Sequence, residues 1–247
     1  MLTVFNSRGY RATTMDELAT VPITARGERS DRWEGVQHGD LVTEIRRGFE
    51  GIGLTPKETR LSLQDSGHGL VGAFVFDTPE EHRIEGAPRM DLSCGFIHSN
   101  DSRRALHGAI GTNVSVCANG MCSGEFTWSR KHTNRLELDE WVADGVGKFA
   151  NSMDRNKVEI EELVNASITG REASECLVAL GRRKILSWKR VGQVDEFWVK
   201  PPYPEFAEPT AFNFYQAFNE VAKRTPMQSQ FRTLRAGFQT IKDVCLN

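Results

Sequence analysis

The residues of this sequence that are best suited to chemistry are thiols and imidazoles grouped in one part of the chain. They are Cys94, His98, Cys117, Cys122 and His132. Such side chains could form a thiol nucleophile or ligate a transition metal. Structural zinc sites usually have two tight ligand pairs, and no second pair is complete here. We therefore expect no metal, no cofactor and no catalytic residue. A thiol- or metal-dependent enzyme using Cys117, Cys122 and His132, such as a nuclease or an anti-defence factor, is kept as the alternative.

The stretch NVSVCANGMCSGEF, which contains two of these thiols, is also typical of a β-hairpin. Asn119 and Gly120 stand between apolar runs, and a type I′ turn needs two residues that accept positive φ. Cys117 would then face Cys122 across the two strands. The five cysteines are an odd number, which favours a reducing compartment over a disulfide framework. The pattern predicts a tight turn flanked by reduced thiols.

Known catalytic motifs are missing from the sequence. It contains no G-x-x-x-x-G-K-[ST] loop, no H-E-x-x-H, no G-x-S-x-G and no dinucleotide fingerprint. We expect a binding protein rather than an enzyme.

Two segments combine tryptophan with clustered cations. WSRKHTN places Trp128 just before Arg130 and Lys131, and RRKILSWKR places Trp188 among five basic residues. Cations bind phosphates and exposed aromatic rings stack on bases, which is how single-strand binders work. The alternative is that both tryptophans are core residues and the charges form a solvated face. The formal net charge of −2 favours one basic face over a uniformly basic surface.

A cationic pattern also follows the C-terminal segment MQSQFRTLRAGFQTIKDVC. Its apolar residues form a helical stripe made of Phe231, Leu234, Phe238, Ile241 and Cys245. Basic residues recur one position further along, about 100° around the helix. The complete set of predicted nucleic-acid-binding residues is Arg130, Lys131, His132, Arg182, Arg183, Lys184, Trp188, Lys189, Arg190, Arg232, Arg235 and Lys242.

The elements that must position these residues change in type along the chain. The sequence predicts an α+β fold, in which N-terminal antiparallel β-hairpins form a curved sheet, followed by a long helix and a helical C-terminal half. We expect a β-rich subdomain at 1–135 and a mostly helical one at 136–247. A Pro-rich linker occupies 200–210, and the whole forms one compact unit.

In the first half, the apolar spacing predicts a helix over 40–52 that starts at Asp40. A hairpin follows around the loop Asp65–Gly69, and 89–99 reads as a third strand. DSRRALHGAIG is interpreted as a short helix or crossing loop.

In the second half, a long helix or helix pair begins at Leu138. REASECLVALG predicts a helix that ends at Gly181, and two further helices are separated at Pro226.

The sequence suggests a cytoplasmic protein without a membrane partner. No apolar run is long enough to cross a bilayer, and the N-terminus lacks the pattern of a secretory signal. If the chain is phage-encoded, its compartment is the cytoplasm of the host cell.

Three motifs resemble a phage- and plasmid-borne family filed as domain of unknown function 932. The first corresponds to His98-Ser99-Asn100-Asp101-Ser102, which departs from an Asn-Ser-Tyr/His-Asp-Gly-Ser-like element. The second is Val116-Cys117-Ala118-Asn119-Gly120, and the third is Lys131-His132-Thr133, with Lys in place of Arg. TAFNFYQAFNEVAKRT is similar to the family's closing aromatic-rich helix. The likeness runs from about Leu61 to Leu246.

The resemblance implies a mobile-element origin and a role near DNA metabolism, without an established activity. Phages commonly encode single-strand annealing proteins whose α+β cores combine a curved sheet with a long helix and assemble into rings or filaments. By this fold-level analogy we expect a homo-oligomer that binds single-stranded DNA, or anneals it, in recombination or replication. A virion or scaffold component is the second alternative.

Overall fold

A computed structural model describes residues 9–23, 35–101, 104–114, 126–133, 136–225 and 227–246. The chain divides into two compact units. The first, called the sheet unit, comprises 1–77, 91–110 and 126–152, and the second, called the helical unit, comprises 78–90, 111–125 and 153–247. The long helix α3 (Leu138–Asn165) contributes residues to both units.

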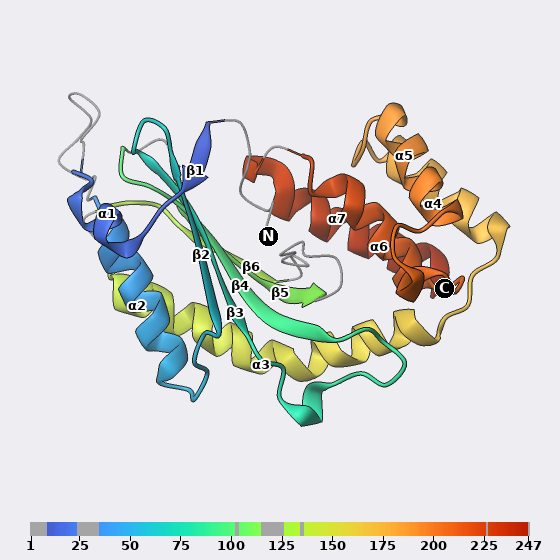
Figure 1. The fold of residues 1–247 in the computed structure, drawn as a ribbon, viewed down its shortest axis with the longest axis horizontal. Coiled ribbons are helices and arrows are strands. Elements are labelled where there is room, and N and C mark those ends of the chain that lie inside the picture. The colour runs from blue at the N-terminus through green and yellow to red at the C-terminus, as the bar shows by residue number, and fades with distance from the viewer. Residues whose placement is uncertain are drawn as a thin grey trace. The chain divides into compact units, whose positions relative to one another are not determined.

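An antiparallel sheet forms the centre of the sheet unit, and its six strands lie side by side in chain order (Figure 1). The predicted α+β order, with strands first and helices afterwards, is confirmed. The strands are β1 (Tyr10–Ala12), β2 (Glu58–Gln64), β3 (Gly69–Phe76), β4 (Met90–Ser99), β5 (Leu106–Val114) and β6 (Phe126–Arg130).

The predicted hairpin joins β2 to β3. Leu63 pairs with Leu70 across the loop, and Gly67 takes a φ of 75°, a conformation that glycine adopts without steric cost. The predicted third strand is β4, which begins at Met90.

The interpretation of DSRRALHGAIG as a short helix or crossing loop is wrong, because residues from Leu106 onward form β5. Gly108 of β5 lies under the indole of Trp128 in β6, and a Cβ at Gly108 would come within 2.3 Å of that ring. The strand conformation of this segment therefore depends on packing against the neighbouring strand, which the local sequence pattern does not reveal.

The predicted turn at Asn119-Gly120 and the thiols of Cys117 and Cys122 lie outside the described residues. The described part of the β5–β6 ladder pairs Ile110 with Phe126.

Helix α2 (His38–Glu50) and the first part of α3 cover one face of the sheet (Figure 1). Phe49 of α2 contacts Phe76 of β3 and Phe149 of α3, with ring centroids 4.7 and 5.0 Å apart. Of the apolar residues that predict this helix, Leu41, Ile45 and Phe49 are buried as expected, whereas Ile52 is 44% exposed because α2 ends at Glu50. Asp40 is not the N-cap: α2 starts two residues earlier, and the side chain of Gln37 accepts a hydrogen bond from the His38 amide.

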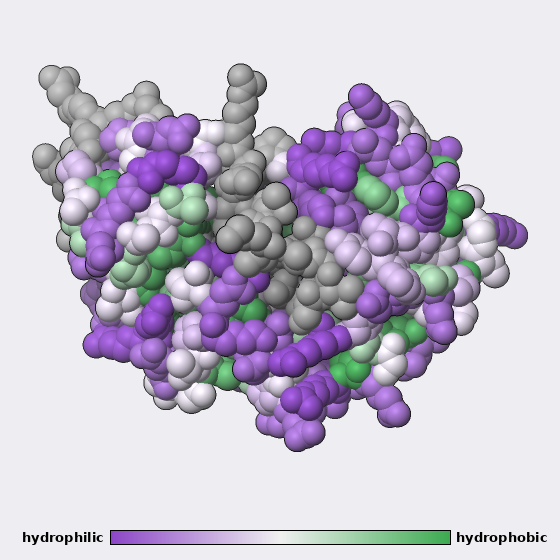
Figure 2. Space-filling view, viewed as in Figure 1, coloured by the Kyte–Doolittle hydropathy of each residue, from purple (hydrophilic) through white to green (hydrophobic). Residues whose placement is uncertain are grey.

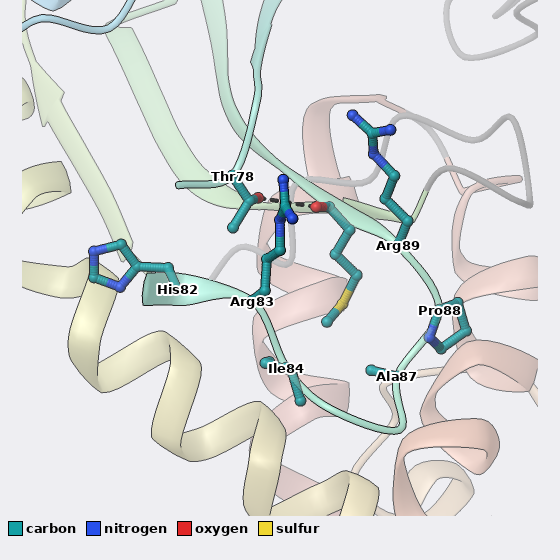
Figure 3. A pocket seen from close by; sticks show the side chains of 8 residues that line it. Thr78, His82, Arg83, Ile84, Ala87, Pro88 and Arg89 are labelled. Carbon is teal, nitrogen blue, oxygen red and sulfur yellow. Dashed lines mark hydrogen bonds between the residues drawn. The ribbon is translucent and has the colours of Figure 1, made fainter. Parts of the chain in front are cut away.

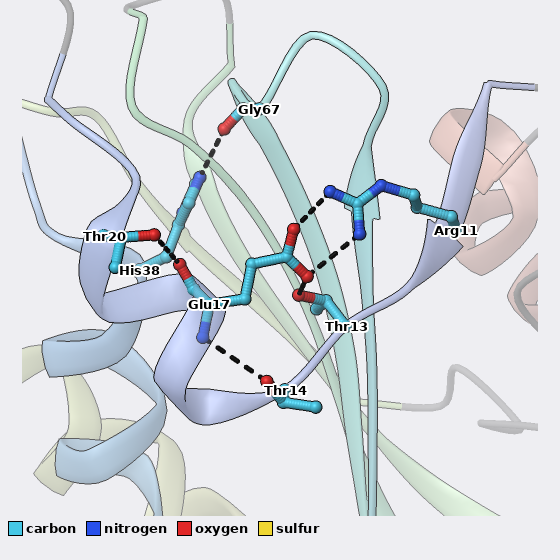
Figure 4. A network of polar contacts seen from close by, with 7 residues as sticks. All are labelled: Arg11, Thr13, Thr14, Glu17, Thr20, His38 and Gly67. Atoms are coloured by element: carbon cyan, nitrogen blue, oxygen red, sulfur yellow. Dashed lines mark hydrogen bonds and ion pairs between the residues drawn. The ribbon is translucent and has the colours of Figure 1, made fainter.

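The short helix α1 (Met15–Thr20) is attached to β1 by one carboxylate (Figure 4). Glu17 accepts hydrogen bonds from the guanidinium of Arg11 and from the hydroxyl of Thr13, which lowers the pKa of Glu17 to about 2. Thr14 caps the helix by accepting a bond from the Glu17 amide.

The helical unit is built around α6, whose twelve residues are all buried. Tyr215 of α6 packs on Phe238 of α7, and Phe214 packs on Trp198 of α5. α4 has a capping box between Thr169 and Glu172. The helices are α4 (Gly170–Arg182), α5 (Trp188–Val199), α6 (Ala211–Ala222) and α7 (Met227–Cys245), and the short turn η3 (Pro204–Phe206) lies in the predicted linker.

Most helix predictions in this half are confirmed. α3 is one continuous helix from Leu138, and α4 ends one residue beyond the predicted Gly181. Leu234, Phe238 and Ile241 of the predicted stripe of α7 are buried and Cys245 is partly buried, while the side chain of Phe231 lies outside the description. α5 is a helix that the sequence reading did not identify.

The segment before β4 folds back on itself and contains the short turn η1 (Glu80–His82). The Thr78 hydroxyl donates to the Met90 carbonyl at 2.9 Å, and the closed loop lines a cavity of about 320 Å³ (Figure 3). His82 is one of the residues that line this cavity, and its Nδ1 lies 3.5 Å from Asp154 of α3. Arg83, which is paired with Glu80, and Arg89 line it as well.

The surface drawn in Figure 2 is mostly hydrophilic, and its hydrophobic residues form small separate patches. No helix of the described residues is both long enough and apolar enough to span a membrane.

Candidate functional site

Three histidines from distant parts of the sequence meet inside the sheet unit. His38 begins α2, His98 lies near the end of β4, and His132 follows β6. The ring centroids of His38 and His98 are 4.7 Å apart, and those of His98 and His132 are 5.0 Å apart. His38 and His98 are fully buried, and His132 is 6% exposed. We call these three residues the histidine cluster.

The hydrogen bonds fix the ring protons of two members. His38 Nε2 lies 3.0 Å from the carbonyl of Gly67 (Figure 4), and a carbonyl only accepts, so Nε2 carries a proton. In neutral His38 the Nδ1 is then an acceptor. His98 Nδ1, 2.7 Å away, must donate to it. His98 Nε2 is consequently unprotonated, and it forms no hydrogen bond with any described residue.

The surroundings oppose a positive charge on these rings. Burial lowers the pKa of His98 well below its ordinary value, and His38 and His132 lower it further. Burial is also the largest cause that lowers the pKa of His38, partly offset by the Gly67 carbonyl and reinforced by His68 and His132. The pair is therefore neutral at neutral pH.

Polar side chains beside the cluster connect it to the N-terminal segment. Asn100 donates from Nδ2 to the Pro22 carbonyl at 2.9 Å, and Gln37 donates to the Val21 carbonyl at 2.7 Å. Ser99 donates to Asp101. Two of the motifs noted in the sequence, around His98 and around His132, thus come together at one end of the sheet.

The geometry of the histidine cluster favours a role in stabilising the fold over a role in catalysis. A general base must reach the proton that it removes, and these rings are enclosed. Within the described residues, no group of three or more His, Cys, Asp or Glu side chains could hold a metal ion. Cys94 lies on the same face of β4 as His98, but it is fully buried opposite Phe74.

The two tryptophans of the basic segments lie in different environments. Trp128 is a core residue, packed on Trp141 with centroids 5.2 Å apart, whereas Trp188 is 60% exposed. Arg130 and Lys131 are exposed, but neighbouring His132 is buried in the histidine cluster.

Trp188 is the first residue of α5, and its ring rests on a glycine. A Cβ at Gly181 of α4 would lie 2.5 Å from the outer edge of the six-membered ring, so only glycine allows this approach. The rest of the ring stays open to solvent. The ring thus packs on the α4 backbone at Gly181 while much of its surface remains available for stacking.

Three exposed cations neighbour Gly181 and Trp188 along the chain. The side chains of Arg182, Lys184 and Lys189 form no ion pair or hydrogen bond with another residue that the structure describes. Lys189 stands in the first turn of α5, which contains no acidic residue, although a helix dipole disfavours cations there. We call Gly181, Arg182, Lys184, Trp188 and Lys189 the Trp188 surface.

Other predicted cations are engaged within the protein. Arg183 bonds Asp243 and Thr240 of α7 at 3.0 and 2.9 Å. Arg190 donates to the Arg224 carbonyl. Lys242 is paired with Glu159 and Glu162 of α3. These side chains would have to exchange an existing partner for a phosphate.

Arg232 and Arg235, the two other predicted cations of α7, are exposed. Residues 130–132 belong to the sheet unit, and the nine other predicted nucleic-acid-binding residues belong to the helical unit.

Sequence reasoning missed His38 and Gly181. His38 is one histidine at the start of a helix, and only the fold shows that it meets His98, 60 residues away. Gly181 was interpreted as a helix stop. Trp188 follows only seven residues later in the sequence, and this short separation was the available signal that the two residues could meet.

Comparisons with known proteins give one match. A family model described as domain of unknown function DUF932 matches residues 25–240. No curated protein and no solved structure matches the chain.

Proposed function

We propose that this chain, which belongs to the DUF932 family, is a DNA-associated protein that binds single-stranded DNA through the Trp188 surface. The observation that carries the proposal is an exposed indole that packs on Gly181, next in the chain to exposed cations that have no partner among the described residues.

The chemistry of this surface matches an unpaired strand. Lysine and arginine neutralise phosphates and release counterions, and an exposed aromatic ring stacks on a base without regard to its identity. In a duplex, the bases are stacked on one another and their faces are closed to a side chain. The surface should therefore favour single strands and show little sequence preference.

The N-terminus of α5 adds to this attraction. Its first amides have no partner within the helix, and they carry the positive end of the helix dipole. Ser187, the N-cap residue, makes no side-chain cap bond. A phosphate beside Lys189 would meet both its ammonium group and these amides.

The proposal extends to assembly and to biological setting. The sheet followed by a long helix is compatible with the coarse order of single-strand annealing proteins, an analogy at the level of the fold. On that analogy we propose a homo-oligomer that acts in recombination or replication in the cytoplasm of a host cell, as a phage or plasmid protein. Light scattering with and without oligonucleotide tests the assembly separately from binding.

A binding titration tests the main proposal. Fluorescence anisotropy of a labelled oligonucleotide is measured with increasing protein, for the single strand and for its duplex, at low and at raised salt. We expect tighter binding of the single strand and an affinity that falls linearly with salt on logarithmic axes. Equal affinity for the duplex, or no binding at micromolar protein and low salt, would refute it.

A further inference from the structure

Two thiols of the helical unit lie in contact. The Sγ atoms of Cys176 in α4 and Cys245 at the end of α7 are 3.5 Å apart, although the residues are 69 positions apart in the chain. A disulfide bond is about 2.05 Å long, so the sulfurs need to approach by only about 1.5 Å to form one.

The two thiols differ in accessibility and in acidity. Cys176 is fully buried, whereas Cys245 is partly exposed. The contact with Cys176 lowers the pKa of the Cys245 thiol against the opposing effects of burial and Glu172. The same contact and burial raise the pKa of Cys176. Because the thiolate is the reactive form, Cys245 is the more reactive of the two.

The surrounding contacts hold the helices that carry the pair. Arg183, the residue after α4, binds Asp243, two residues before Cys245. Lys242 binds Glu159 and Glu162 of α3. Ion pairs just before Cys245 therefore hold the last turn of α7 against α3 and the end of α4, so the two sulfurs do not have to find each other by diffusion.

We propose that Cys176 and Cys245 form an oxidation site, in which a hydroperoxide oxidises Cys245 and Cys176 completes a reversible disulfide. The Cys245 thiolate attacks one peroxide oxygen and breaks the O–O bond, which gives a sulfenic acid and, after proton transfer, water or an alcohol. The Cys176 sulfur then attacks the Cys245 sulfur and displaces hydroxide, which takes up the Cys176 proton and leaves as water. Two thiols are oxidised and one peroxide is reduced.

The disulfide would join the end of α7 to the second turn of α4. α4 leads directly into the turn that carries the Trp188 surface, so the bond would restrain the helix beneath that surface. The oxidation itself does not depend on DNA binding, and its test involves no nucleic acid.

Peptide mapping of the folded full chain tests this site. The protein is treated with about one equivalent of hydrogen peroxide, the stoichiometry of one disulfide. Remaining thiols are alkylated, and the digest is analysed by mass spectrometry without reductant. We expect a linked peptide pair containing Cys176 and Cys245, which disappears after reduction. In the Cys176→Ala variant, a β-diketone reagent should trap a sulfenic acid at Cys245.

The controls separate proximity from general thiol reactivity. Cys94→Ser should leave the link intact, and Cys245→Ser should abolish it. The yield of this link should be at least several-fold higher in the native chain than in the chain unfolded in guanidinium, where all cysteines meet at random. The proposal fails if the link is absent from the native wild type, or if unfolding does not lower its share among the cysteine pairs.

Discussion

His38 and His98 meet through their Nδ1 atoms, 2.7 Å apart, in a contact that requires one ring to donate and the other to accept. Two imidazolium rings would both present N–H groups and repel each other. The contact therefore exists only while at least one of the rings is neutral.

This arrangement predicts loss of stability in mild acid. In the unfolded chain both rings take up protons as the pH falls through about 6.5, whereas in the folded chain their pKa values are lowered. The folded state then binds fewer protons, so its stability is fully present above pH 6.5 and falls below it. The slope should reach about 1.4 kcal/mol per pH unit for each ring, until the folded pKa is passed. Urea unfolding followed between pH 7.5 and 5.5 measures it.

A matched variant assigns that slope to the histidine cluster. His98→Asn places an amide N–H where Nδ1–H stands, and the new side chain does not titrate. We expect a lower stability at every pH from lost packing, together with a shallower decline in acid. A variant that loses stability in acid as steeply as the wild type would assign the effect to other groups.

Gly181→Ala should displace the indole of Trp188 without removing it. The added Cβ would come within 2.5 Å of the ring, so the ring must move. We expect weaker single-strand binding. Gly192→Ala in α5 is the control, because a Cβ there meets nothing within 4 Å. It should stabilise the protein by roughly 0.5–1 kcal/mol and leave binding unchanged. Equal affinities of the two variants would argue that the position of the ring is irrelevant.

Arg232 and Arg235 test whether the bound strand extends to α7. If both contact phosphates, the double alanine variant should flatten the slope of log affinity against log salt by about 1.4. Folding should change little, because both side chains are exposed. An unchanged slope would make these arginines part of a solvated face.

The sequence was most informative where one segment determines its own structure. The hairpin between β2 and β3, the long α3 and the buried face of α7 all follow from local periodicity and turn residues. β5 was misread because its small residues are selected by Trp128 of the neighbouring strand.

The two tryptophans show why the site could be only partly predicted. Both stand beside cations in the sequence, yet Trp128 faces inward against Gly108 and Gly145, while Trp188 rests on Gly181 and faces solvent. The inward orientation of Trp128 follows from the alternation of side chains along β6, whereas the exposure of Trp188 follows from its position at the start of α5. The histidine cluster was hidden for a related reason, since its members come from three separate segments.

The most direct test of single-strand binding through the Trp188 surface is the affinity of the Trp188→Ala variant for a single-stranded oligonucleotide. Loss of one stacked base should cost about 1–3 kcal/mol, which is a decrease in affinity of roughly 5- to 150-fold. Trp188→Phe should retain much of the wild-type affinity. Val199→Ala, which removes a 75% exposed apolar side chain from the other end of α5, should bind like the wild type. A Trp188→Ala variant that is folded and binds the single strand as tightly as the wild type would contradict the account.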